Sequence, residues 1–120
     1  MSRLIDIIEE ILIRTAKSKK TITYSQLIRK INENYGKNIP ERGNLSVFIL
    51  THNLQKICMK YTEMGKPMLG SVVVSSKDGY PSVGFFKLAE RIYKIKFKTD
   101  ESKKIFWQNE LKKVYTEFEN

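Results

Sequence analysis

Apolar residues at helical spacing constrain this chain most strongly, and they recur in four separate segments. The first covers residues 3–16, the second follows residues 21–23 and stops at Gly36, the third covers about 45–63, and the last begins at Ser102. Apolar positions at i, i+3, i+4 and i+7 are typical of a helix that buries one face. The stripe of the third segment consists of Val47, Leu50, Leu54, Ile57, Cys58 and Tyr61. The sequence therefore predicts four helices.

Between the third and the last of these helices the pattern changes to one typical of β-strands. Residues 68–75 form an apolar, β-branched run, and Pro81 to Phe86 follow after Lys77-Asp78-Gly79-Tyr80. Asp-Gly is among the strongest short hairpin signals. With a short β-branched strand at 21–23, the order is helix, strand, helix, helix, hairpin. This order predicts an α+β fold, a winged helix-turn-helix in which the hairpin is the wing.

The C-terminal part of the chain extends this core. At 120 residues the chain has the usual size of one domain. We expect a single domain over residues 1–120, with 1–86 as the winged-helix core and 87–120 as a C-terminal helical extension packed on it. Residues 88–97 fit a helix or a strand, and the pattern leaves both possibilities open.

Cysteine content and hydropathy exclude several classes of protein. Cys58 is the only cysteine, which excludes an internal disulfide and a cysteine-based zinc site and favours a reducing, cytoplasmic location. No apolar run approaches the 18 or so residues of a membrane span, so no membrane partner is expected. Asp6, Glu9 and Glu10 interrupt the apolar start of the chain, which is unlike a signal peptide.

The charge balance points to an anionic partner. Twenty-two Lys and Arg residues against thirteen Asp and Glu residues give a net charge of +9. The excess is spread along the chain, with no acidic or basic tail, so it belongs to the folded body. A basic domain of this size commonly binds phosphate backbones. The other interpretation is a lysine-rich surface without a specific partner.

One short motif resembles a known DNA-binding domain. The motif Thr23-Tyr24-Ser25-Gln26-Leu27 is similar to the T-Y-x-x-[LI] helix entry in the DNA-binding domain of alkylguanine-DNA alkyltransferases and alkyltransferase-like proteins. The resemblance to that domain covers residues 21–86. The reactive Pro-Cys-His-Arg segment of that family has no match, because residues 66–70 read Lys-Pro-Met-Leu-Gly. The resemblance implies a winged-helix frame without alkyl transfer.

A second resemblance covers about half of the chain. Residues 65–69 follow the pattern G-x-P-x-L, residues 79–86 follow G-x-P-x-x-G-F-F, and residues 106–115 follow F-W-x-x-E-L-x-x-V-Y. This combination resembles small, largely uncharacterised bacterial domains in defence and mobile-element contexts. It implies the fold more than the function, and suggests an accessory or regulatory role in a phage, mobile-element or defence setting.

The candidate nucleic-acid surface lies on the third predicted helix and the predicted wing. In a winged helix the later helix of the pair enters the major groove and the hairpin touches the backbone. Asparagine suits an adenine edge, and lysine suits phosphate or guanine. The predicted binding residues are Arg42, Asn44, His52, Asn53, Lys56, Lys60 and Lys77. Lys17, Lys19, Lys20 and Lys37 are expected to extend this surface. Double-stranded DNA is the first expectation, and RNA remains open.

The residues do not favour an enzyme or a cofactor. His52 and Cys58 are six residues apart on one predicted helix, about 120° apart around it, and therefore cannot form a catalytic dyad. Asp100 with Glu110-Leu111-Lys112 echoes a nuclease pattern. That pattern works on a strand, where positions i and i+2 share a face, and here it falls in a helix. We expect a non-catalytic protein without cofactor or metal.

A protein-binding role is the alternative to nucleic-acid binding. The last predicted helix carries Phe106, Trp107, Tyr115 and Phe118 on more than one face. These aromatic residues are expected either to pack on the core, to form a homodimer seam, or to dock on a larger partner. An inhibitor of a larger nucleoprotein enzyme, such as an anti-defence protein, would also fit.

Overall fold

The computed structural model describes residues 3–41 and 43–119. Over these residues the elements are α1 (Leu4–Lys17), β1 (Ile22–Thr23), α2 (Tyr24–Tyr35), α3 (Asn44–Glu63), the 3₁₀ helix η1 (Leu69–Val72), β2 (Val73–Val74), α4 (Val83–Tyr93) and α5 (Asp100–Glu117). The four helices predicted from spacing are confirmed as α1, α2, α3 and α5. Between them the chain contains a fifth helix, α4, in place of the second strand of the expected hairpin.

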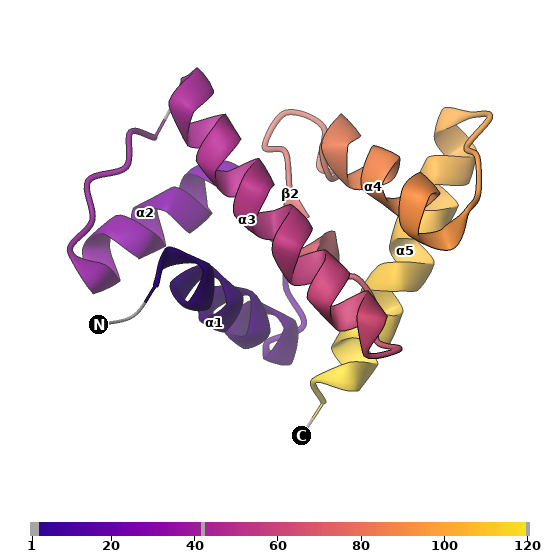
Figure 1. Ribbon diagram of the computed structural model, residues 1–120, viewed down its shortest axis with the longest axis horizontal. Coiled ribbons are helices and arrows are strands. Elements are labelled where there is room, and N and C mark those ends of the chain that lie inside the picture. The colour runs from indigo at the N-terminus through magenta and orange to yellow at the C-terminus, as the bar shows by residue number, and fades with distance from the viewer. Residues whose placement is uncertain (1–2, 42, 120) are drawn as a thin grey trace.

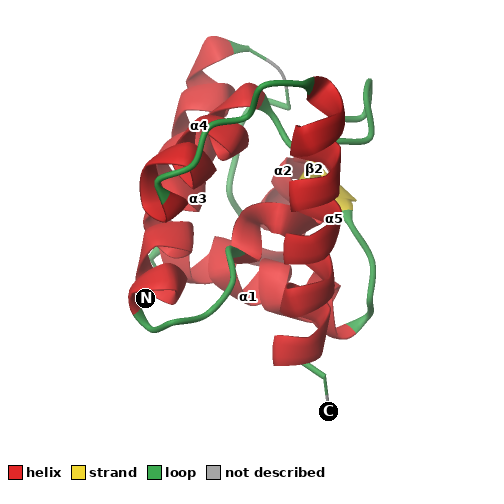
Figure 2. Cartoon of the chain, turned by 90° about the vertical axis from the view of Figure 1, so that its right-hand side faces the viewer, coloured by secondary structure: helices red, strands yellow, loops and turns green. Residues whose placement is uncertain are grey.

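Helix α3 organises the molecule. It runs diagonally across Figure 1, with α1 and α2 on one side and α4 and α5 on the other. The strands are very short beside the helices, as Figure 2 shows for β2. They pair in parallel, with Ile22 opposite Val73 and Thr23 opposite Val74. The α2–α3 pair is therefore the crossover between two parallel strands.

Local sequence signals set the ends of these helices. Thr23 and Gln26 form a capping box at the start of α2, since each side chain accepts a hydrogen bond from the other residue's backbone N–H, at 3.1 and 3.0 Å. This arrangement satisfies two amide groups that a helix start leaves open. Gly36 ends α2 in the left-handed conformation, with φ +65°, which glycine adopts without steric cost.

Two apolar clusters fill the interior. The larger joins α1, α2, α3, η1 and α5, and includes Ile8, Leu12, Leu27, Leu50, Ile57, Leu69, Val72 and Val114. The smaller joins the end of α3 and β2 to α4 and α5, and includes Cys58, Met68, Val74, Phe85, Phe86, Leu88 and Trp107. Val114 of the expected extension lies in the larger cluster, so α5 contributes directly to the core.

The predicted winged helix-turn-helix is wrong, because the structure has no β-hairpin wing among the described residues. Met68 to Val74 are all buried, and a fully buried apolar run cannot be assigned to strand or helix by periodicity alone. The turn at Asp78-Gly79 does exist, closed by the Ser75 N–H donating to the Tyr80 carbonyl at 2.7 Å. It leads into α4 instead of a second strand.

The start of α4 explains the error. The expected strand ended at Phe86. The buried residues Phe85, Phe86, Leu88 and Ala89 follow a helical period, which becomes visible only when residues beyond Phe86 are included.

No helix among the described residues is long and apolar enough to cross a membrane.

Candidate nucleic-acid interface

Helix α3 carries most of the residues predicted to contact nucleic acid. Asn44, His52, Asn53, Lys56 and Lys60 all lie on it. Lys77 is exposed in the turn that follows β2, although this turn is not the tip of a wing. Arg42 lies outside the described residues.

Two of these side chains already have partners inside the molecule. The Asn53 side-chain amide donates to the Ile49 carbonyl at 2.8 Å. The Lys60 ammonium lies 2.9 and 3.0 Å from the two carboxylate oxygens of Glu9, on α1. Glu9 also accepts from the Tyr61 hydroxyl at 2.6 Å. Asn53 and Lys60 are therefore already engaged within the molecule, and Glu9 balances part of the positive charge of Lys60.

The other predicted residues of α3 are exposed. The His52 ring stacks on the Phe48 ring, with centroids 6.0 Å apart and planes 5° apart. Lys56 follows one turn later and forms no ion pair with any described residue. Among the predicted lysines of α3, Lys56 is therefore the one whose charge is available to a ligand.

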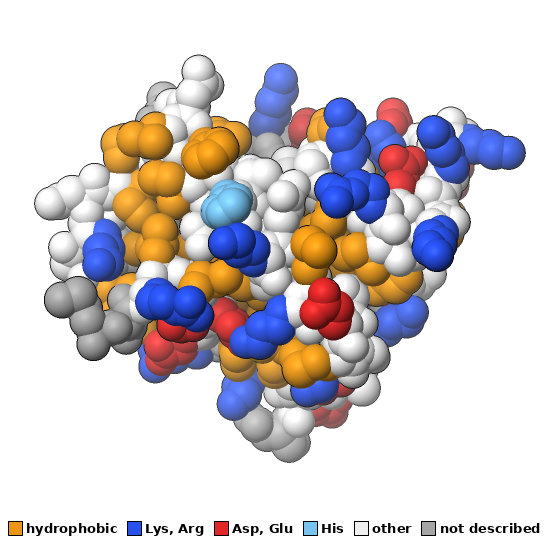
Figure 3. Space-filling view, in the orientation of Figure 1, with side chains coloured by type: hydrophobic (Ala, Val, Ile, Leu, Met, Phe, Trp, Pro, Cys, Tyr) orange, Lys and Arg blue, Asp and Glu red, His pale blue; other side chains and the backbone are white. Residues whose placement is uncertain are grey.

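The two halves of α3 differ in chemistry. Residues 43–55 contain no Asp, Glu, Lys or Arg, and Leu45, Val47 and Phe48 are 63%, 63% and 68% exposed. Charged residues begin at Lys56. Figure 3 shows hydrophobic side chains over the first half of α3, and Lys and Arg side chains over its second half and over α4. The charge-free half offers no ionic contact to a phosphate backbone.

Helix α4 adds cations that the sequence analysis did not select. Its first turns pack on α3, where Thr51, Gln55 and Cys58 line a small cleft with Gly84 and Leu88. Helix α4 then exposes Lys87 and Arg91, and Lys94 is exposed directly after it as the C-cap residue. These three cations form no ion pair with any described residue. We call Lys56, Lys87, Arg91 and Lys94 the α3–α4 basic face.

The loop after α4 continues the same charge. Lys96 and Lys98 are exposed there. Between residues 87 and 98 the single carboxylate is Glu90, which accepts a hydrogen bond from the Phe97 N–H at 3.0 Å and so closes the loop. The i, i+4 spacing of Lys87 and Arg91 was the sequence signal for this face. It was missed because the strand assignment ended at Phe86.

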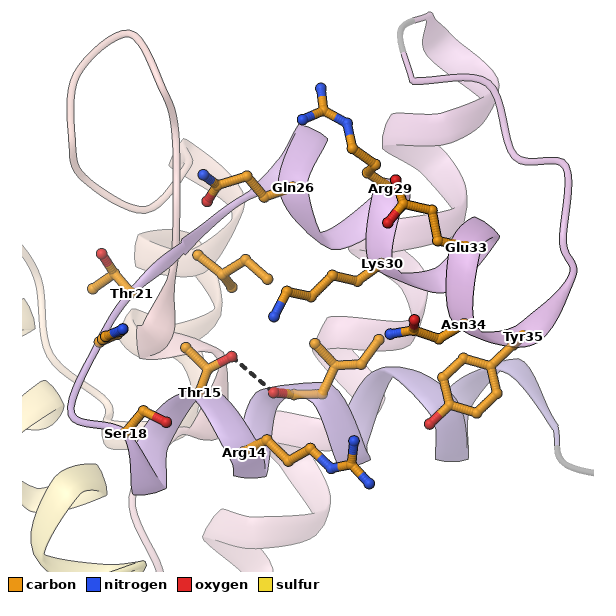
Figure 4. A pocket seen from close by; sticks show the side chains of 13 residues that line it. Arg14, Thr15, Ser18, Thr21, Gln26, Arg29, Lys30, Glu33, Asn34 and Tyr35 are labelled. Atoms are coloured by element: carbon orange, nitrogen blue, oxygen red, sulfur yellow. Dashed lines mark hydrogen bonds between the residues drawn. The ribbon is translucent and has the colours of Figure 1, made fainter.

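A second cationic region lies between α1 and α2. This groove of about 490 Å³ includes Arg14 and Lys20 from the α1 side, Arg29 and Lys30 from α2, and the carboxylate of Glu33. Figure 4 shows the Lys30 side chain extending from α2 into the groove.

Neighbouring carboxylates neutralise part of the charge in this groove. Arg14 is paired with Glu10 at 2.7 Å, and Arg29 with Glu41 at 3.0 Å. Lys20 and Lys30 form no ion pair with described residues. This leaves the groove with two available cations and one opposing carboxylate, a weaker positive region than the α3–α4 basic face.

The residues considered for catalysis have structural contacts. Cys58 is buried against η1, and the Gly70 N–H donates to its sulfur at 3.3 Å. Burial raises the pKa of the Cys58 thiol from 9.0 to about 12, so the reactive thiolate is disfavoured. His52 is exposed on α3. The described residues contain no group of three or more His, Cys, Asp or Glu side chains placed to hold a metal ion.

Glu110, part of the nuclease-like pattern, is 2% exposed. It accepts hydrogen bonds from the Met68 N–H, at 2.9 Å, and from the Tyr93 hydroxyl. Its position between Trp107 and Val114, at helical spacing, was the sequence signal that this carboxylate points inward. Glu110 therefore connects α5, α4 and the segment before η1.

Comparison with known proteins gives no assignment for this chain. No protein family, curated protein or solved structure matches it.

Proposed function

We propose that this protein is a non-catalytic nucleic-acid-binding protein and that it grips the phosphate backbone with the α3–α4 basic face. The observation that carries the proposal is the group of exposed cations on α4 and the following loop: Lys87, Arg91, Lys94, Lys96 and Lys98, with Glu90 as the single carboxylate among residues 87–98. Lys56 adds charge from α3. Double-stranded DNA is the expected ligand.

The arrangement favours backbone contact over base reading. Lysine acts as a mobile point charge that suits phosphate, and four of these five side chains are lysines. Phosphate contacts position a protein on nucleic acid without selecting sequence. The expected binding is therefore weakly selective, micromolar or weaker at physiological salt, and steeply salt-dependent because bound phosphates release counterions.

The test is a titration of a labelled DNA duplex at two or more salt concentrations. For the wild type, the logarithm of affinity should fall linearly with the logarithm of salt concentration, by about 0.9 per phosphate contacted. The variant K87E/R91E should bind at least about tenfold more weakly, with a salt slope smaller by about 2, because two phosphate contacts are lost.

A matched control separates this face from total charge. The variant K20E/K30E lowers the net charge by the same amount, but changes the α1–α2 groove instead. It should bind closer to the wild type than K87E/R91E does. Equal or greater loss in K20E/K30E, or an affinity independent of salt, would contradict the proposed interface. The same titration with an RNA duplex distinguishes the two nucleic acids.

A protein-docking function is the second candidate, and the exposed first half of α3 favours it. Contiguous exposed apolar surface on a monomer commonly marks an interaction site. The aromatic residues of α5 give less support to a docking role. Trp107 is buried and donates to the Ser71 carbonyl at 2.8 Å, and Phe118 packs edge-on against Tyr61. Ile105 is the large hydrophobic residue that α5 exposes.

A further inference from the structure

The first half of α3 exposes large apolar side chains as well as burying one. Its inner side buries Leu50 in the core, whereas Leu45, Val47 and Phe48 remain more than 60% exposed. Three large apolar side chains exposed together on one helix are typical of a surface that a partner covers. In a chain with 29% charged residues, the absence of any charge between 43 and 55 is a second sign of a surface that is covered.

A groove lies beside these exposed residues. It has a volume of about 270 Å³ and runs between α2, the start of α3 and the turn after β2. Tyr24, Ile28, Val47 and Leu50 give it an apolar lining, and its one charged lining residue, Glu41, is paired with Arg29 at 3.0 Å. An apolar cavity of about 150 Å³ is already large enough to hold a benzene ring. The groove therefore has room for an aromatic side chain, and the exposed Phe48 follows its lining residue Val47 on the same helix.

We infer that two copies of this chain associate through this patch, with α3 packing against α3 of the second copy around a two-fold axis. A two-fold interface uses the same patch on both subunits and must be complementary to itself. Here one patch holds both a projecting ring, Phe48, and a groove that can receive one. The second copy supplies the same pair in reverse, so two rings fill two grooves.

Charge also permits a second copy at this place. Each chain carries +9, and like charges brought together across an interface are repelled. The charge-free stretch 43–55 allows contact without that repulsion, while Lys56 and the rest of the α3–α4 basic face lie beyond it. The inference does not depend on nucleic-acid binding, but such a dimer would present two basic faces.

Light scattering coupled to size exclusion tests the inference on the full chain without nucleic acid. The wild type should have twice the 14.1 kDa mass of one chain. F48E should reduce the mass to that of one chain, because an unpaired carboxylate would have to be buried against Ile28, Val47 and Leu50. I105E is the matched control, since Ile105 on α5 is also an exposed apolar residue, at 52%, and it should remain a dimer. Circular dichroism confirms that both variants fold.

Cross-linking gives a second readout. Because the native Cys58 is buried, an introduced surface cysteine becomes the thiol that a short bis-maleimide can reach. V47C should give a cross-linked pair of chains, and I105C should not.

Three results would overturn the inference. The first is a monomeric wild type at about 100 µM, where a dimer with a Kd of about 1 µM would be almost fully formed. The second is a dimer that survives F48E. The third is equal loss of the dimer in F48E and I105E. If the wild type is monomeric and F48E instead weakens duplex binding, the patch belongs to the nucleic-acid surface.

Discussion

Glu110 shows how much one buried side chain can determine. It lies on α5 at 2% exposure and accepts hydrogen bonds from the Met68 N–H and the Tyr93 hydroxyl, while the Lys113 ammonium approaches it to 3.9 Å. A buried carboxylate is tolerated only when its oxygens have such partners. Its role is to hold α4 and the segment before η1 against α5.

Replacing this carboxylate should destabilise the fold. E110A leaves the Met68 N–H buried without an acceptor and removes the acceptor of the partly exposed Tyr93 hydroxyl, so the free energy of unfolding should fall by about 2 kcal/mol. E110Q keeps an acceptor and should cost less. Urea unfolding measures both variants. Glu63 is exposed at the end of α3, and E63A should change stability by no more than about 0.5 kcal/mol. Equal effects of E110A and E63A would contradict the assigned role.

At the scale of elements, the contact between α3 and η1 is unusually close. A Cβ atom on Gly70 would lie 2.8 Å from the Cys58 sulfur, which is well inside contact distance. Gly70 is not among the glycines with positive φ, so the position requires glycine for space and not for backbone conformation. The contact places the start of β2 beneath α3.

The variant G70A should therefore lower the free energy of unfolding by about 1–3 kcal/mol through overpacking. The loss should be smaller in a C58A background, where the sulfur atom is absent, and a double-mutant cycle measures the difference. Gly84 is the matched control, because a Cβ there would meet its nearest neighbour at 3.7 Å, and G84A should be neutral or slightly stabilising. The same loss for G70A with and without the sulfur would contradict the steric explanation.

At the scale of the whole molecule, the buried Cys58 thiol and two hydrogen-bonded tyrosine hydroxyls make stability depend on pH in the alkaline range. Burial raises the pKa of Cys58 from 9.0 to about 12. Burial also raises the pKa values of Tyr61 and Tyr93, and their hydrogen bonds to Glu9 and Glu110 raise them further. Above pH 9 the folded protein thus holds protons that the unfolded chain releases.

Unfolding free energy falls with pH wherever the folded state binds more protons than the unfolded state. The stabilisation is fully present below pH 9 and should be lost progressively between pH 9 and about 12. Urea unfolding across this range should show a smaller loss in C58A than in the wild type, because one of the responding groups is gone. The readout is the change in unfolding free energy with pH within each protein, because the small cavity left by C58A lowers its stability at every pH. An identical pH dependence in both would contradict the contribution of the thiol.

The candidate site was only partly predictable from single residues. The exposed position of Lys56 follows from its place off the apolar stripe of α3, and the structure agrees. The same reasoning predicted that Lys60 would be exposed with its charge free. In the structure the Lys60 ammonium instead contacts the carboxylate of Glu9, which is 51 residues away in the sequence. Helical spacing cannot show which side chain of another helix will lie opposite, so the loss of free charge at Lys60 was not predictable.

The sequence by itself determined what depends on neighbouring positions: the spans of α1, α2, α3 and α5, the buried faces of α1 and α2, the stop of α2 at Gly36, the turn at Asp78-Gly79 and the total charge. These features follow from hydrophobic periodicity and from hydrogen bonds between neighbouring residues. The total charge is the sum of the charges along the chain. The buried stripe expected on α3 was wrong at Val47, which is 63% exposed. Tertiary structure alone decided that Val73 and Val74 pair in parallel with Ile22 and Thr23, that α4 replaces a wing, and that Lys and Arg side chains gather over α4 and the second half of α3. Those outcomes depend on contacts between segments far apart in sequence, because a short buried apolar run takes its conformation from the surfaces that enclose it.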